Sequence, residues 1–178
     1  DLEVSFFMVA LFVSLLLALP LQAVQSSATN EATSALPRIA TVDWTIAEIL
    51  LALGVTPLAV GDAGPYQAWV GEPRLPAGVV DIGLRTQPNR ELLAELKPDR
   101  ILISPLAAPL APTLSRIAPV STIALYDGQT DLWQRLHEVT LTLARMVGKT
   151  AEGERLLAGL DRDLAKMQGR LPADLPPL

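Results

Sequence analysis

Val79–Ser104, which reads VVDIGLRTQPNRELLAELKPDRILIS, is the part of the sequence that is most informative about the fold. Short apolar runs at its two ends, Val79–Gly83 and Ile101–Ser104, are typical of buried strands. Between them, Asn89 is a favourable cap for a helix, leucines follow at helical spacing, and Pro98 ends the pattern. A strand, a helix and a second strand in this order predict one unit of a parallel α/β sheet.

The same alternation continues on both sides of this stretch. Asp131 is a favourable cap for a helix that runs to Met146, and a capping box of Thr45 and Glu48 starts another helix, which Gly54 closes. The other predicted strands and a short helix cover Arg38–Val42, Pro57–Val60, Val120–Leu125 and Pro112–Ala118. The predicted fold class is therefore α/β, with a mostly parallel sheet flanked by helices in a Rossmann-like lobe.

A long helix is predicted near the end of the chain. Thr150 is its expected cap, and it runs for about 20 residues, or roughly 30 Å at 1.5 Å per residue. Its apolar stripe consists of Leu156, Leu157, Leu160, Leu164 and Met167. We place the lobe at residues 38–148, this helix at 149–171, and the truncated start of a second lobe at 172–178.

An uncharged apolar run, Phe6–Leu19, lies near the beginning of the chain. Its length is typical of a secretory signal, since a bilayer span takes roughly 20 residues. Cleavage is expected after Ala23 or Ala28, so residues 1–28 are interpreted as a signal-like segment and 29–37 as a polar tether. The chain opens without a Met or a basic segment, so the natural start is expected to be missing; an uncleaved membrane anchor is the alternative. Both interpretations export the remainder.

Composition excludes several classes of function. The 178 residues are 50% hydrophobic with a net charge of −5, which suits a domain with a core and disfavours nucleic-acid binding. Without Cys and with one His, the chain offers no disulfide, thiol nucleophile or His cluster for a metal. It also lacks a Gly-rich phosphate loop and a G-x-S-x-G motif. We therefore predict no enzyme, no catalytic residues and no metal ligands, and we expect His137 on a solvated helix face.

Three aromatic residues fall at the carboxyl ends of predicted strands, where parallel α/β sheets bind their ligands. Trp44, Tyr66 and Trp69 could each wall a binding cleft. The alternative for each is that it packs its loop against the core.

Arg85 directly follows the predicted strand Val79–Gly83. Its guanidinium would point to the ligand side of the sheet, where several donors and a permanent charge suit anionic oxygens. A surface ion pair with Asp62 or Glu72 is the alternative. Asp81, within the strand, is expected to make a structural hydrogen bond.

Several motifs in this region are familiar. They are EILLALGV at 48–55, YQAWVGEP at 66–73, DIGLRTQPN at 81–89 and ELKPD at 95–99. With them, the chain from about Pro37 to Arg170 resembles the first lobe of the periplasmic ferrichrome-binding proteins, which belong to the iron-complex substrate-binding proteins of ABC importers.

The resemblance implies two α/β lobes bridged by one long helix, with the ligand between the lobes, so this chain would hold only the first lobe. The implied ligand is a ferric hydroxamate siderophore, which brings its metal already bound, so no cofactor is expected. Arg85 would meet the hydroxamate oxygens and Trp69 would line the cleft; the other expected ligand-binding residues are Trp44, Tyr66 and Ser104. The implied partner is an inner-membrane ABC permease, and the protein would be a periplasmic monomer.

Two residues depart from the family pattern. Ala107 stands where the family usually has a ligand-binding Tyr, and Pro112 lies near the place of a Glu that docks on the permease. Because one lobe offers only half of the cleft, the chain alone is expected to bind ligand weakly or not at all. Cobalamin, haem or a catecholate as the cargo, or a truncated remnant that transports nothing, are the alternatives.

Overall fold

A five-stranded parallel sheet forms the centre of the computed structural model, which describes residues 36–126, 128 and 130–170. Its strand order is β3-β2-β1-β6-β7, and every pairing in it is parallel, as predicted. The strands are β1 (Ile39–Thr41), β2 (Ala59–Val60), β3 (Val80–Asp81), β6 (Arg100–Ile103) and β7 (Val120–Thr122). The predicted signal, most of the tether and the segment 172–178 lie outside the described residues.

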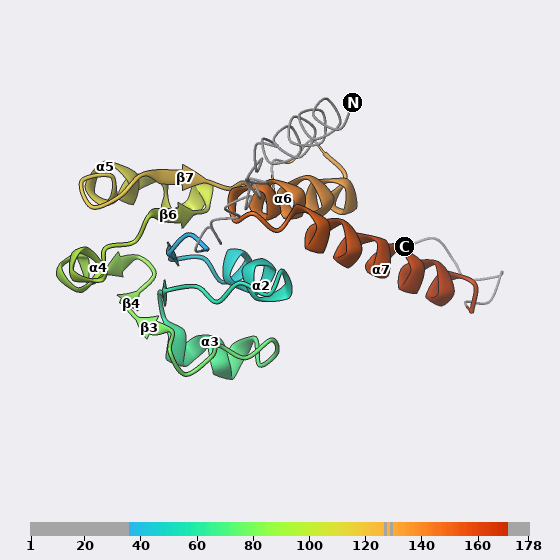
Figure 1. The fold of residues 1–178 in the computed structure, drawn as a ribbon, viewed down its shortest axis with the longest axis horizontal. Helices are drawn as coiled ribbons and strands as arrows, with labels where there is room; N and C mark the ends of the chain where they lie inside the picture. Colours follow the sequence, from blue (N-terminus) through green and yellow to red (C-terminus); the bar gives the residue numbers. More distant parts are fainter. Residues whose placement is uncertain (1–35, 127, 129, 171–178) are drawn as a thin grey trace, which may run out of the picture. The chain divides into compact units, whose positions relative to one another are not determined.

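Helices cover both faces of this sheet (Figure 1). Successive residues of a strand point to opposite faces of the sheet. Ile39 and Leu102 pack with the helices on one face, whereas Ala40 and Ile101 pack with the helices on the other. The first side holds α2 (Trp44–Ala52), α3 (Ala63–Trp69) and α6 (Leu132–Met146); the second holds α4 (Arg90–Leu96), the 3₁₀ helix η1 (Pro105–Leu110) and α5 (Ala111–Leu114). Right-handed crossovers require this change of side, because the strand order reverses direction after β3.

Two helix caps differ from the prediction, by two residues in α2 and by one residue in α7 (Thr150–Gln168). Asp43, not Thr45, caps α2, and its Oδ1 accepts a hydrogen bond of 3.2 Å from the backbone N–H of Ile46. Helix α7 contains Thr150 as its first residue, so the predicted cap is wrong there as well. The Asp43 cap prevails because the Thr41 hydroxyl accepts the Asp43 N–H at 3.0 Å and so holds the end of β1.

The stretch after β2 is more regular than predicted. Residues 63–69, expected as a loop, form α3, and Pro65 is tolerated because it lies in the first turn, where its missing N–H has no helical partner. The predicted strand Val79–Gly83 is divided into β3 and the start of a small antiparallel hairpin of β4 (Gly83–Leu84) and β5 (Gln87–Pro88). This hairpin carries Arg85 and Thr86 in its turn.

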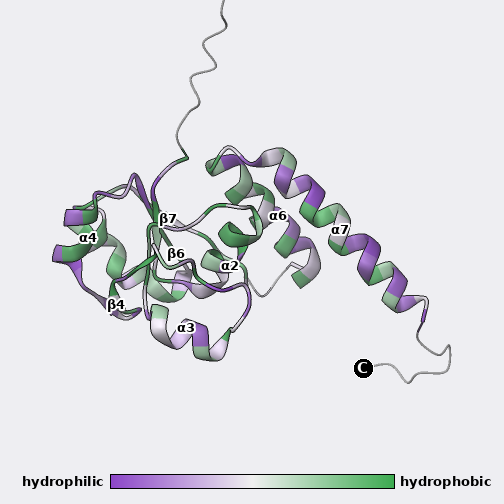
Figure 2. Ribbon diagram, turned by 60° about the horizontal axis from the view of Figure 1, so that its bottom comes forward, coloured by the Kyte–Doolittle hydropathy of each residue, from purple (hydrophilic) through white to green (hydrophobic). Residues whose placement is uncertain are grey.

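Helix α7 packs on α6 through the first half of its apolar stripe. Gly153 and Leu157 are buried there, whereas Leu160 is 39% and Met167 57% exposed. Figure 2 shows hydrophilic and hydrophobic residues alternating along α7. The charged side of this helix makes ion pairs one turn apart, such as Lys166 with Asp163 at 3.0 Å, as a solvated face does.

His137 links α6 to α7 rather than lying free in solvent. Its Nδ1 is 2.9 Å from the carbonyl oxygen of Trp133, and its Nε2 is 3.2 Å from the carboxylate of Asp161. Trp133 Nε1 donates to the same carboxylate at 3.1 Å. Because both ring nitrogens face acceptors, the imidazolium, which has two N–H donors, satisfies this arrangement better than the neutral ring.

The pKa of His137 is therefore expected above its ordinary 6.5, first because of the Trp133 carbonyl and then because of Asp161, with burial opposing both. The stabilisation that His137 provides is full below its unfolded pKa and is lost as the pH rises through the folded pKa. An NMR titration of the ring C2–H should give the pKa of His137 without ambiguity, since the chain has one His. Asp161→Asn should lower the pKa only partway, because the carbonyl remains; an unchanged pKa in this variant would contradict the link.

Candidate functional site

The strand order reverses between β1 and β6, and the segments that follow these two strands diverge there. Parallel sheets bind ligands in the crevice at such a switch point. Two cavities of about 420 and 370 Å³ meet at this place and share Asp43, Ser104 and Leu106. We name them the Arg85 cavity and the Tyr126 cavity after a residue that lines each. A third hollow of about 570 Å³ lies beside the start of α4 and α5 rather than at the strand ends.

Arg85 lies in the β4–β5 turn and lines the first cavity. Its backbone N–H donates to Oδ2 of Asp62 at 3.1 Å, and its Nε lies 3.6 Å from the same oxygen. The alternative partner, Glu72, pairs with Arg74 instead. With 43% of its side chain exposed, Arg85 makes the ion pair and also faces the cavity, so the two interpretations of this residue are compatible.

Trp44 belongs to the site because it contacts Arg85. The guanidinium carbon of Arg85 lies 3.9 Å from the centre of the Trp44 ring, in a cation–π arrangement. The indole N–H donates to the carbonyl oxygen of Gly61 at 2.9 Å, and the ring meets Tyr66 edge to face at 5.9 Å. Trp44 is therefore half-buried beneath the guanidinium and does not line either cavity.

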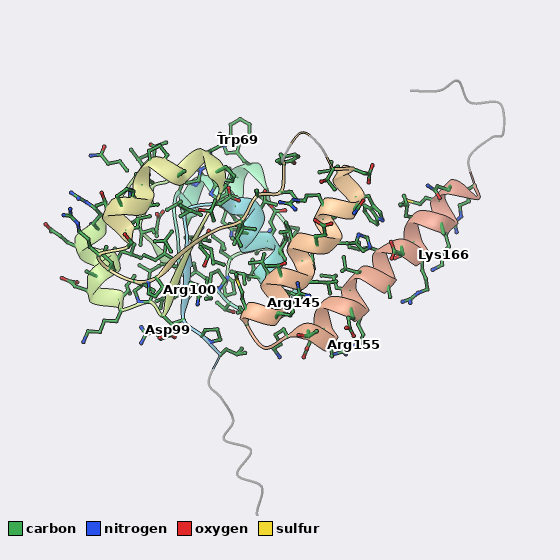
Figure 3. All side chains as sticks on the ribbon, turned by 90° about the horizontal axis from the view of Figure 1, so that it is seen from above. Trp69, Asp99, Arg100, Arg145, Arg155 and Lys166 are labelled. Carbon is green, nitrogen blue, oxygen red and sulfur yellow. The ribbon has the colours of Figure 1, made fainter. Side chains whose placement is uncertain are left out.

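Tyr66 and Trp69 lie in different environments, one buried and one exposed, although both belong to α3. Tyr66 is fully buried and donates from its hydroxyl to the Pro73 carbonyl at 2.7 Å; burial raises its pKa to about 12. The expectation that Tyr66 binds ligand is thus replaced by its alternative, packing against the core, because the helix turns it inward. Trp69 is 82% exposed, and Figure 3 shows its ring standing off the ribbon. Neither residue lines the two cavities.

The loop after β6 forms the shared wall of the cavities. Ser104 lines both, as expected from its place at the strand end, and Ala107 lines the Arg85 cavity with no polar group to offer. Leu106 is 94% exposed and Tyr126 73% exposed, so both present apolar surface to solvent. Asp43, Leu106 and Tyr126 were not among the predicted ligand-binding residues, although Asp43 and Tyr126 lie at the carboxyl ends of predicted strands and Leu106 follows one closely.

Among the described residues that line the Arg85 cavity, carboxylates outnumber cations. Asp43 and Asp62 line it together with Arg85, so its one cation faces two carboxylates. Asp81 points elsewhere: its Oδ1 accepts from the Gly83 N–H at 2.9 Å, which confirms the predicted structural hydrogen bond. Among the described residues, no group of three or more His, Cys, Asp or Glu could hold a metal ion, and no helix is long and apolar enough to cross a membrane.

Several known proteins are similar to this chain in sequence and in fold. The iron(3+)-hydroxamate-binding protein FhuD of Escherichia coli (strain K12) is 38% identical over 133 residues, 75% of this chain and 45% of that protein. The probable siderophore-binding lipoprotein YfiY of Bacillus subtilis (strain 168) is 32% identical over 132 residues, 70% of this chain and 37% of that one. The chain thus spans less than half of these relatives.

A solved structure gives the same result for the fold. The siderophore-binding protein FhuD from Vibrio cholerae, crystallised with Fe3+–Desferal, matches with a TM-score of 0.72 and 34% identity over 76% of this chain and 51% of that one. The model of the periplasmic binding protein family matches residues 39–178. Because this match covers most of the sequence, the chain belongs to the periplasmic binding protein family.

Proposed function

We propose that this chain provides one wall of the binding cleft in the solute-binding component of an ABC importer for ferric hydroxamate siderophores. The component would act in the periplasm as a monomer, catalyse no reaction and deliver its ligand to an inner-membrane permease. The observation that carries the proposal is Arg85, which faces a cavity at the switch point of the sheet with its charge offset by carboxylates. Relatives whose names refer to hydroxamate and siderophore binding support it.

The charge of the cavity favours hydroxamates over catecholates. Hydroxamate groups balance the charge of a ferric ion, whereas catecholate groups leave the complex strongly negative. A strongly negative complex would meet one cation, Arg85, and two carboxylates, Asp43 and Asp62. A neutral complex avoids this repulsion and still offers anionic oxygens to the guanidinium. Apolar surface at Leu106 and Tyr126 suits the organic part of such a ligand.

Binding can be tested with the gallium(III) complex of desferrioxamine, which is diamagnetic and stands in for the ferric complex. We expect saturable NMR shifts at Arg85, Thr86 and Ser104 and weaker or no shifts with a gallium catecholate. Arg85→Gln should weaken hydroxamate binding about tenfold to a hundredfold, because a hydrogen bond to a charged group is lost. NMR detects weak complexes, so the test holds even if one lobe binds poorly.

Arg90→Gln is the matched control, since Arg90 lies on α4 and outside the Arg85 cavity. It removes the same charge from the chain and should leave the shifts unchanged. Tighter binding of the catecholate, or shifts that do not saturate with either complex, would argue against the proposal.

A further inference from the structure

The guanidinium of Arg85 is held by groups from two different segments of the chain. Asp62 contacts the Arg85 backbone N–H at 3.1 Å and its Nε at 3.6 Å with one carboxylate oxygen. The Asp62 backbone N–H also donates to the Gly83 carbonyl at 2.7 Å, which attaches the β4–β5 hairpin to the segment after β2. Asp62 thus fixes both the main chain and the side chain of Arg85.

The Trp44 ring packs against one face of the Arg85 guanidinium. This ring cannot turn freely, because its N–H is bonded to the Gly61 carbonyl and its other side meets Tyr66. Gly61 also has to be small here: a Cβ at this position would lie 3.1 Å from Cγ and 3.3 Å from Cα of Arg85. The side chain of Arg85 therefore runs between close neighbours instead of moving freely in solvent.

The terminal nitrogens of Arg85 remain available. Within the described ranges, neither Nη1 nor Nη2 donates a hydrogen bond to another residue. Nε and one face of the guanidinium are occupied by Asp62 and Trp44, and the residue lines the Arg85 cavity. We propose that Asp62 and Trp44 are positioning residues, which hold Arg85 with its Nη groups ready for the oxygens of the ligand.

This inference builds on the proposed function and explains why a carboxylate stands beside the cation that should bind anionic oxygens. On charge alone, Asp62 weakens such binding. As a positioning residue it strengthens binding, because a fixed side chain loses less conformational entropy when the ligand arrives. The two effects have opposite signs, so a substitution separates them.

Asp62→Asn and Asp43→Asn form the decisive pair. Asn adopts the left-handed conformation of Asp62, at φ 52°, readily, and Asn caps a helix as well as Asp43 does, so both variants should fold. We expect Asp62→Asn to weaken binding of gallium desferrioxamine about twofold to tenfold. Asp43→Asn, which removes a charge from the same cavity without touching Arg85, should tighten binding, because only the charge effect operates there. Equal tightening by both variants would overturn the inference.

A measurement without ligand keeps the inference separate from the proposed function. Nitrogen-15 relaxation of the Arg85 Nε–H group should show a rigid side chain in the unchanged protein and a mobile one in Asp62→Asn and Trp44→Leu. If the unchanged chain binds neither gallium complex, the proposed function fails. The relaxation measurement needs no ligand, so it still tests the positioning role of Asp62 and Trp44. A side chain that is equally rigid in all three proteins would refute that role.

Discussion

Replacing Tyr66 by alanine should lower the free energy of unfolding by about 3–5 kcal/mol, the usual cost of truncating a buried aromatic side chain. Tyr66 is fully buried against Ala47 and Val60 and donates its hydroxyl proton to the Pro73 carbonyl. Tyr66→Phe should cost about 1 kcal/mol, because it removes that hydrogen bond and keeps the ring. Urea unfolding followed by far-ultraviolet circular dichroism measures both.

Trp69→Ala is the control for this prediction. Trp69 lies on the same short helix and is 82% exposed, so its removal should change stability by no more than about 0.5 kcal/mol. A loss in Trp69→Ala as large as that in Tyr66→Ala would contradict the division of roles. If only Tyr66→Ala loses much stability, Trp69→Ala remains folded. Ligand titrations on Trp69→Ala then measure binding and are not affected by unfolding.

These two residues also show where sequence reasoning reaches its limit. Both belong to the polar stretch after the second strand, and from the sequence both were candidates for the cleft. The decisive information was that residues 63–69 form a helix, which its composition hides: Gly64 and Pro65 are poor helix formers in general. Once the helix forms, residues three apart can lie on different sides of the boundary between core and solvent.

The sheet itself was predictable to a greater degree. Apolar runs bounded by turn residues indicated all five parallel strands, and only their lengths and the β4–β5 hairpin were missed. Arg85 could be placed at the ligand edge because it follows a strand. An ion pair with Asp62 was one of two alternatives from the sequence, and the structure selects it over Glu72. The contact with Trp44 could not be predicted, since it joins segments more than twenty residues apart and no local pattern specifies such a distance.

A second large effect is expected where α6 and α7 cross. A Cβ on Gly153 would lie 2.7 Å from the Cβ of Ala144, closer than carbon atoms approach, and 3.5 Å from Leu53. Ala144 is short and lies on α6, so the helices themselves would have to separate. Gly153→Ala should therefore destabilise the protein by about 1–3 kcal/mol, although alanine is the better helix former.

Gly159→Ala, on the same helix, should have the opposite sign. A Cβ there meets only an Arg162 nitrogen at 3.9 Å, so the gain in helix propensity, up to about 1 kcal/mol, should appear undiminished. Both variants make the same chemical change in one helix. Helix propensity therefore cannot explain a difference between their free energies of unfolding in urea. If both variants were stabilised, α7 would not be held against α6 by this contact. If they diverge as expected, Gly153 sets the distance between α7 and the rest of the α/β unit.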